Sequence, residues 1–285
     1  MSTSPEARLW VLLARNEPYG VIFRRGPSKQ VMLIKWNTRR DTFEHGQWFK
    51  GRVYERRCDV SPNGEFLIYF AAKQKPPLYS WTAISKPPYF TAIALWPKGD
   101  CWNGGGWFMD DKRIRLNHSP DEAKLQPGFQ PGPIKIVGYG EYRGENSTVW
   151  DIVRSQNGWK RIAAGNYIDR GSARGWKLSP PQRWQKPHPR EGGFTLEMTI
   201  VGIGGKDVPW YQIEYRVLIS TGGTLDLGLV DWADWDHRGD LIFAKKGAIF
   251  RQEFRKSIFA EPRQIADFNS LKFEEVVAPS EACRW

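Results

Sequence analysis

The chain has 285 residues, 40% hydrophobic and 26% charged, so it is long enough to bury a sizeable core. Its formal net charge is +11, but the basic residues are dispersed, and no block of five like charges forms a basic tail. Three cysteines, at positions 58, 101 and 283, are too few for a disulfide framework and too far apart for a zinc site. The apolar run 9–14 is too short for a signal sequence or a membrane span, so we expect a cytoplasmic protein without a membrane anchor.

Short segments rich in β-branched and aromatic residues predict strands along most of the chain. Residues 4–16 are compatible with a strand or with a helix capped by Ser4 and started by Pro5. Further strands are predicted at 21–26, 30–36, 65–72, 89–96, 134–140, 148–153, 195–204, 211–220 and 240–244. A two-turn helix capped by Ser119 is predicted to stop at Pro127, and the Pro-rich stretch 178–193 is expected to be an internal loop. Because no long amphipathic helix is visible, a βαβ sheet is not expected.

An internal repeat indicates the architecture. The stretches 59–71 and 234–244 align so that Asp59 falls on Asp234 and Gly64 on Gly239, and this alignment places Glu65 on Asp240 and Phe66 on Leu241. Each copy consists of an apolar strand end, a polar turn and an apolar strand. The glycine at a fixed place predicts a positive φ angle in the turn.

Residues 57–72 and 232–252 resemble the inner strands and turns of blades in WD-type β-propellers. The Trp-Asp dipeptides at 150–151 and 235–236 do not occupy equivalent places in the repeat, and the resemblance points to no specific characterised family. It implies an all-β fold made of a single β-propeller-like domain over 1–285, with about five irregular blades of antiparallel strands. The irregular spacing of the strands leaves a six-bladed ring or a bent sandwich as alternatives. A weaker similarity between the first and last strands predicts that the N- and C-terminal segments pair.

The Arg-Gly-Asp tripeptide at 238–240 lies inside the second copy of this repeat. An integrin ligand, a calcium loop and a structural turn are the three interpretations. Arg238 stands where a calcium loop needs an oxygen ligand, and no glutamate closes the loop. Since Gly239 matches Gly64, we predict a structural turn.

Sequence motifs for catalysis are absent. The four histidines, at positions 45, 118, 188 and 237, have no partner at metal-ligand spacing, and no nucleophile elbow or P-loop is present. We therefore expect no catalytic residues, no metal and no cofactor. A carbohydrate-active propeller enzyme stays open as a second alternative, because paired carboxylates could come from different blades. The candidates for such a pair are Asp59, Asp100, Asp110, Asp111 and Asp234.

Fifteen tryptophans and the dispersed basic residues favour a binding protein. We predict a non-catalytic scaffold module that recognises a protein partner through rim loops rich in Trp and Arg, and the basic surface favours an acidic partner. The Gly-rich loop 102–108 is the first candidate, and the predicted contact residues are Trp102, Trp107, Arg39, Arg40, Arg56 and Arg57. The alternative is a nucleic-acid-binding protein that uses the basic stretch 35–57, where aromatic residues are interleaved with basic ones. The oligomeric state is not predicted.

Overall fold

The computed structural model describes residues 6–26, 29–130, 132–140, 147–171, 174–206, 208–255 and 258–285. The protein is all-β and 7% helical, and five small sheets are arranged as a five-bladed β-propeller, which confirms the predicted fold class. The chain divides into two compact units: unit 1 is Met1–Val153 with Phe268–Trp285, and unit 2 is Arg154–Asp267. Within the described ranges, no helix is long and apolar enough to cross a membrane.

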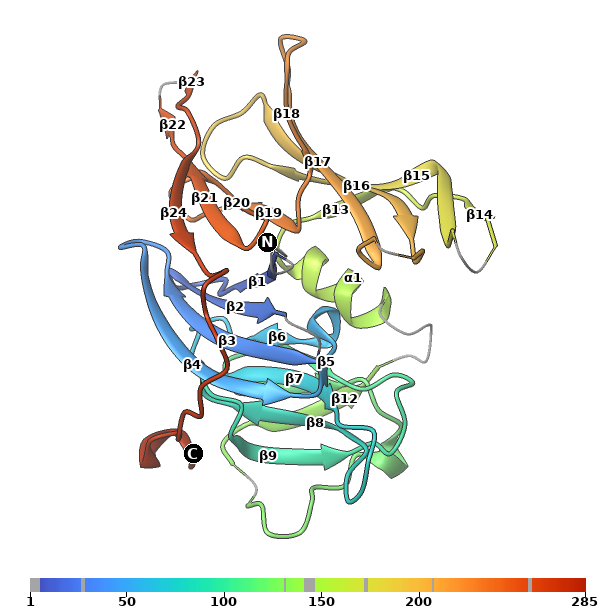
Figure 1. Cartoon of the computed structure of the whole chain (residues 1–285), viewed down its shortest axis with the longest axis vertical. Helices are drawn as coiled ribbons and strands as arrows, with labels where there is room; N and C mark the ends of the chain where they lie inside the picture. The colour runs from blue at the N-terminus through green and yellow to red at the C-terminus, as the bar shows by residue number, and fades with distance from the viewer. Residues whose placement is uncertain are drawn as a thin grey trace, which may run out of the picture. The chain divides into compact units, whose positions relative to one another are not determined.

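Unit 1 contains three sheets (Figure 1). The first is a meander of β1 (Arg8–Leu13), β2 (Tyr19–Arg25), β3 (Gln30–Asn37) and β4 (Thr42–Lys50). The second contains β5 (Arg52–Val53), β6 (Asp59–Val60), β7 (Leu67–Ala72), β8 (Ser80–Ser85) and β9 (Ala92–Pro97). The third contains β10 (Gly106–Asp110), β11 (Arg113–Leu116) and β12 (Lys135–Tyr139), with β11 and β12 running parallel. The 3-10 turn η1 (Glu55–Arg57) connects β5 to β6.

Unit 2 contains two larger sheets and a two-stranded ribbon. The first sheet is formed by β13 (Lys160–Ala163), β14 (Tyr167–Asp169), β15 (Trp176–Pro187), β16 (Phe194–Ile203), β17 (Tyr211–Ile219) and β18 (Thr224–Leu229). The second is formed by β19 (Trp232–Trp235), β20 (Leu241–Lys245), β21 (Ala248–Gln252) and β24 (Arg263–Asp267). Strands β22 (Phe254–Arg255) and β23 (Ile258–Phe259) pair as the ribbon.

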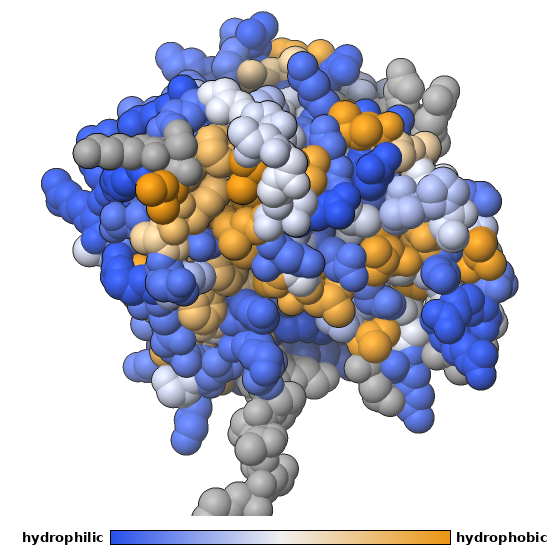
Figure 2. All heavy atoms as spheres, turned by 90° about the horizontal axis from the view of Figure 1, so that it is seen from above, coloured by the Kyte–Doolittle hydropathy of each residue, from blue (hydrophilic) through white to orange (hydrophobic). Residues whose placement is uncertain are grey.

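Hydrophobic residues also reach the surface. On the face shown in Figure 2 they form several groups set among hydrophilic residues. Many of the large exposed apolar side chains belong to unit 2: Ile162, Tyr167, Ile168, Trp176, Val208, Trp210, Leu229 and Ile258. Exposed aromatic rings of this kind are a feature of binding surfaces when they gather at one place.

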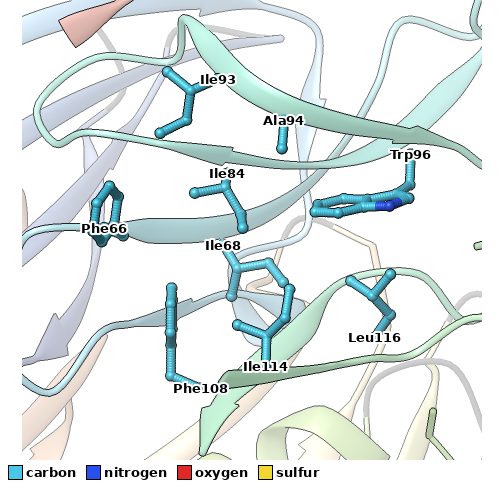
Figure 3. Packing of buried hydrophobic residues seen from close by; sticks show 9 residues of the cluster. All are labelled: Phe66, Ile68, Ile84, Ile93, Ala94, Trp96, Phe108, Ile114 and Leu116. Atoms are coloured by element: carbon cyan, nitrogen blue, oxygen red, sulfur yellow. The ribbon is translucent and has the colours of Figure 1, made fainter. Parts of the chain in front are cut away.

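A core cluster lies between the second and third sheets of unit 1 (Figure 3). Ile68 of β7 and Ile84 of β8 are fully buried and face Phe108 of β10 and Ile114 of β11. Strand β11 contributes Ile114 and Leu116 to this layer, two residues apart as the period of two in a strand requires. The C-terminal Trp285 packs against the cluster and lies 5.9 Å from the ring of Phe66, centroid to centroid.

The N- and C-terminal segments of unit 1 meet, but the described part shows no strand pairing between them. The backbone N–H of Ala7 donates to Asn269 at 2.9 Å, and Arg24 donates to the carbonyl of Phe268 at 3.0 Å. Further along the chain, Gln47 donates to the carbonyl of Val276. The predicted pairing is therefore replaced by side-chain contacts to an extended C-terminal segment that ends in the 3-10 turn η3 (Ser280–Ala282).

Of the two alternatives for residues 4–16, the strand is observed: residues 8–13 form β1, in which Leu9 to Leu12 are all buried, as two-sided packing of a strand allows. Ser4 and Pro5 lie outside the described residues. Three other local predictions need correction. The helix at Ser119 is a single 3-10 turn, η2 (Pro120–Glu122), in which the Ser119 N–H donates to the Glu122 carboxylate. After this turn the N–H of Gln126 donates to the carbonyl of Leu95 in β9, and the chain does not continue as a helix.

The segment predicted as a strand at 148–153 is helix α1 (Ser147–Gln156). Its composition is typical of a strand, since it contains two valines, a tryptophan and an isoleucine. Val149 and Val153, however, are four residues apart and both pack on Trp107. This helical spacing of the buried residues overrides their preference for strands.

The predicted internal loop 178–193 is mostly part of the long strand β15. Prolines 180 and 181 lie at a bulge where the pairing of β15 with β16 is interrupted between Lys177 and Gln182. At this bulge no ladder donor is required from the prolines, so they are tolerated within the strand. The carbonyl of Pro180 still accepts a hydrogen bond from the N–H of Asn166. Residues 188–193 form the turn to β16.

The two copies of the predicted repeat are built alike. Asp59 accepts a hydrogen bond from the next backbone N–H at 2.9 Å, and Asp234 does the same at 2.7 Å. Gly64 has φ +76° and Gly239 has φ +87°, so both adopt the left-handed conformation that the sequence predicts. The repeat is therefore a structural repeat of the blade turn.

The alignment holds up to the glycine and then needs a gap. In the first copy the Ser61 hydroxyl accepts the N–H of Phe66, and in the second the Asp236 carboxylate accepts the N–H of Asp240, each at 2.9 Å. Phe66 therefore corresponds to Asp240, and Glu65 is an insertion of one residue. The sequence alignment placed Phe66 on Leu241 because it contained no gap.

Candidate functional site

The two tryptophans of the Gly-rich loop have opposite environments. Trp102 is 65% exposed, and its backbone N–H donates to Asp100 at 2.9 Å. Trp107 is 2% exposed and packs on Val149 and Val153 of α1. Of this predicted pair, Trp102 alone offers its side chain to a partner, whereas Trp107 is part of a core.

The glycines between these tryptophans are buried rather than exposed. A Cβ atom on Gly104 would lie 2.3 Å from the ring of Phe70, and one on Gly105 would lie 2.0 Å from the carbonyl oxygen of Arg57. The Gly104 N–H also donates to the carbonyl of Asn117 at 2.7 Å. The stretch 104–106 is thus a close crossing of backbone over the second sheet, and the expectation of a flexible recognition loop is corrected.

The predicted arginine pairs also divide. Arg39 and Arg40 are exposed in the turn between β3 and β4, and their backbone N–H groups donate to the side chain of Asn37. Arg57, by contrast, is 1% exposed and donates to the carbonyls of Cys101 and Asn103. Arg57 therefore fixes the Gly-rich loop and cannot reach a partner.

Arg56 is largely covered by aromatic rings. Its guanidinium lies 4.2 Å from the ring centroid of Trp10 and 4.9 Å from that of Trp150, and it pairs with Glu55 at 3.0 Å. A guanidinium in this position is held by cation–π contacts and an ion pair. Arg56 therefore has a structural role, and the structure does not bring the six predicted contact residues together at one surface.

The Arg-Gly-Asp tripeptide is architectural. Asp240 is fully buried and accepts from Arg251 at 3.0 Å and from Arg255 at 2.7 Å. Arg251 also donates to Asp236 at 2.5 Å. Because the aspartate of the tripeptide is inside unit 2, it is inaccessible to an integrin, which confirms the predicted turn.

The carboxylates considered for glycoside chemistry serve local contacts. Asp59 and Asp234 cap the repeat turns, as described above. Asp100 pairs with Lys98, Asp110 pairs with Arg113, and Asp111 accepts the N–H of Asn63. Within the described residues, no group of three His, Cys, Asp or Glu side chains could hold a metal ion.

The histidines are placed separately. His45 and His237 are exposed, and His188 is buried beside the repeat turn, where its Nε2 lies 2.9 Å from the carbonyl oxygen of Gly239. His118 is fully buried, with its Nε2 2.7 Å from the hydroxyl oxygen of Thr82. The Thr82 oxygen in turn accepts the N–H of Gly105, so this His–Thr pair braces the glycine crossing.

Two buried groups of unit 1 titrate with opposite consequences for stability. Burial lowers the pKa of His118 to about 4. Between pH 6.5 and pH 4 His118 is therefore protonated in the unfolded chain but neutral in the folded chain. The free energy of unfolding consequently decreases as the pH falls from 6.5 to 4. Burial raises the pKa of Asp59 to about 6, although Arg15 and two backbone N–H groups act against this. The folded state therefore favours the protonated carboxyl group of Asp59. Its contribution to the free energy of unfolding is fully present below pH 4 and is lost as the pH rises to 6.

We predict that variants of these residues change the pH dependence in opposite directions. Between pH 4 and 6, His118→Gln makes stability fall more with rising pH than in the unmodified protein, whereas Asp59→Asn makes it rise more. The measurement is urea unfolding across this pH range, followed by tryptophan fluorescence. If both variants shift the slope in the same direction, the assignment of the two protonation states is wrong.

One pocket has a volume of about 460 Å³ and lies wholly in unit 1. Its lining comes from the start of β1, the end of β2, the start of β3, the β4–β5 connection and the end of β7. The charged lining residues are Glu6, Arg8, Arg25, Lys29, Arg52 and Lys73. We call this the basic pocket.

The floor of the basic pocket is small and apolar. Val31 and Ala72 are buried there. Gly51 has no room for a side chain, since a Cβ atom would lie 2.5 Å from the ring of Phe49, and its N–H donates to the carbonyl of Lys29 at 2.8 Å. Small residues at the bottom therefore leave the space that the long basic side chains surround.

The charges around the basic pocket are unbalanced. Arg25 lies across the β1–β2 pair from Arg8 and forms an ion pair with Glu55 at 2.5 Å. Burial alone would raise the pKa of Glu55, but Arg25 and Arg56 lower it, so Glu55 is a charged partner that neutralises Arg25.

The remaining cations of the lining are exposed. They are Arg8, Lys29, Arg52 and Lys73, and they face the single carboxylate of Glu6.

The sequence did not predict this pocket, and none of the six predicted contact residues lines it. Arg52 lies in the stretch 35–57 that was singled out as basic, while Arg8, Lys29 and Lys73 come from segments far from it in the chain. The one available indication was that each of these residues stands at the end of a strand. Residues at the strand ends of two neighbouring sheets can converge on one site, but the sequence does not show which strands are neighbours.

Two smaller described pockets have different chemistry. One, of about 210 Å³, is mainly apolar and is lined by Trp96, Leu125, Ile136 and Trp285. The other, of about 260 Å³, lies in unit 2 beside His188 and the exposed Arg255. Its other charged lining residues are Arg190, Arg238 and Glu191. Because Arg238 and Arg255 already pair with buried aspartates, this pocket carries less unbalanced charge than the basic pocket.

Comparison with protein-family models gave no match to the chain, and comparison with curated protein sequences gave none either.

Proposed function

We propose that the protein is a non-catalytic binding module and that it recognises an acidic protein partner through the basic pocket. The observation that carries this proposal is the excess of cations around the pocket: five Lys and Arg side chains and one glutamate line it. Even with Arg25 neutralised by Glu55, the opening offers two guanidinium forks and two ammonium groups. Guanidinium groups bind carboxylates in a bidentate manner, and ammonium groups add charge without fixed geometry.

The size and lining of the pocket favour a peptide over a nucleic acid. A volume of about 460 Å³ accommodates a few residues of an extended acidic segment. The lining contains no aromatic ring, whereas recognition of single-stranded nucleic acid depends on stacking of bases on such rings. An acidic peptide needs only the cations and the small apolar floor.

The test is fluorescence polarisation with a fluorescein-labelled octaglutamate peptide, and an octaglutamine peptide as the uncharged reference. We expect Arg8→Glu combined with Arg52→Glu to weaken octaglutamate binding at least tenfold, because two cations of the pocket become anions. The matched control is Arg39→Glu combined with Arg40→Glu. It makes the same change in net charge at an exposed turn of the same unit.

The control is expected to change the affinity less than threefold. Equal weakening by both double variants would show that the peptide follows overall charge and would refute recognition by the pocket. Absence of octaglutamate binding to the unmodified protein at moderate salt would refute it as well.

A further inference from the structure

One end of the six-stranded sheet of unit 2 is both basic and exposed. Strand β14 is exposed along its whole length, and so are the first three residues of β13. Residues 160–177 contain five basic residues and one acidic residue. They are Lys160, Arg161, Asp169, Arg170, Arg174 and Lys177. The carboxylate of Asp169 accepts the N–H of Gly171 at 2.8 Å and so serves the local turn.

Large aromatic side chains are exposed at the same end of the sheet. Tyr167 is 51% exposed, Trp176 is 46% exposed and Trp210 is 55% exposed. Trp176 lies in β15 and is paired with Asp169 of β14 on one side and with Ile203 of β16 on the other. Trp210 immediately precedes β17. We call these three residues the aromatic face.

The backbone that carries the aromatic face is held by close glycine contacts. Gly175 has φ +65°, and a Cβ atom there would lie 2.4 Å from the carbonyl oxygen of Ile203 and 2.5 Å from the carbonyl carbon of Gly204. The N–H of Gly204 donates to the carbonyl of Trp210 at 2.7 Å. The ring of Trp210 would lie 3.5 Å from a Cβ atom on Gly204. The two indoles are therefore carried by one fixed crossing of the chain.

We propose that the aromatic face binds a single-stranded nucleic acid. Half-exposed indole and phenol rings on a fixed backbone provide stacking surfaces for bases, and neighbouring Lys and Arg side chains neutralise phosphates. The excess of positive charge in residues 160–177 is complementary to the negative charge of the phosphates, so this surface favours a polyanion. Because stacking does not distinguish bases strongly, the binding is tolerant of sequence.

This inference goes beyond the proposed function and uses other residues. The basic pocket is built from unit 1 and has no aromatic lining, while the aromatic face belongs to unit 2. The two proposals can therefore fail independently. Arg8→Glu combined with Arg52→Glu is expected to change nucleic-acid binding less than threefold.

The experiment measures the fluorescence anisotropy of a fluorescein-labelled oligothymidylate of 15 nucleotides, with a duplex of 15 base pairs for comparison. We expect Trp176→Ala combined with Trp210→Ala to weaken oligothymidylate binding at least tenfold. The corresponding double change to phenylalanine keeps a ring at each position and should restore most of the affinity. Trp102→Ala is the matched control, since it removes a more exposed tryptophan from unit 1. It should change the affinity less than twofold.

A second variant tests the contribution of charge. Arg170→Glu combined with Arg174→Glu should reduce the salt dependence of the affinity as well as the affinity itself. Circular dichroism of each variant establishes that the fold is retained. The inference is overturned if oligothymidylate does not bind, if the alanine and phenylalanine pairs bind equally, or if the duplex binds as tightly as the single strand. The alanine pair is also tested with vesicles that contain 30% phosphatidylserine. If it loses vesicle binding while its oligothymidylate binding is unchanged, the aromatic face binds a membrane, and the inference is overturned.

Discussion

Replacement of Arg251 by methionine is expected to lower the free energy of unfolding by about 3–5 kcal/mol. Arg251 is 1% exposed, and its guanidinium lies 2.5 Å from Asp236 and 3.0 Å from Asp240, both of which are fully enclosed side chains. Burial alone would raise the pKa of Asp240, but the N–H of Phe254 and the Arg255 guanidinium lower it. The methionine variant therefore leaves carboxylate charge inside unit 2 without its main counter-ion.

The control for this prediction is Arg238→Met. Arg238 shares both aspartates, but its side chain is 33% exposed and its distances to them are longer, at 3.4 and 3.7 Å. We expect its loss to cost less than about 1 kcal/mol, as for other solvent-accessible ion pairs. Urea unfolding followed by circular dichroism measures both changes. A loss at Arg238 that equals the loss at Arg251 would contradict the assignment of the buried pair as the main contribution.

This ion-pair network shows what a motif in the sequence can and cannot indicate. The repeat predicted that Gly239 forms a turn and that the tripeptide around it is structural, because the turn glycine recurs at Gly64. The sequence did not show that Asp240 is bound by Arg251, since that pairing depends on which strand returns beside the turn. Local backbone requirements were therefore predicted more reliably than the side chains that converge on them.

The candidate sites follow the same division. Exposed Trp102 and the turn residues Arg39 and Arg40 lie at the surface, but Trp107 and Arg57 are buried. Chemical type alone does not separate a rim residue from a residue that braces a loop. The basic pocket assembles residues from strand ends that are distant in the chain, and the aromatic face joins Trp210 to Tyr167 and Trp176, which lie on adjacent strands. Their prediction would have required the order of the strands.

The glycine crossing in unit 1 carries the last prediction. Gly105→Ala is expected to lower the free energy of unfolding by about 3–4 kcal/mol, the sum of a left-handed backbone penalty of about 1–2 kcal/mol and an overpacking cost of about 2 kcal/mol. Gly105 has φ +80°, and its Cβ atom would meet the carbonyl oxygen of Arg57 at 2.0 Å. That oxygen belongs to the backbone and cannot rotate away.

Gly99→Ala separates the two contributions. Gly99 has nearly the same φ, +82°, but nothing lies within 4 Å of a Cβ atom there, so its substitution should cost only the backbone penalty of about 1–2 kcal/mol. Thermal and urea unfolding of both variants give the comparison. If the two cost the same, the chain around Arg57 moves aside readily. The Gly-rich stretch would then be adaptable enough to serve as the recognition loop that its sequence first indicated. A larger cost at Gly105 means that the stretch is fixed and that Trp102 is displayed from a rigid support.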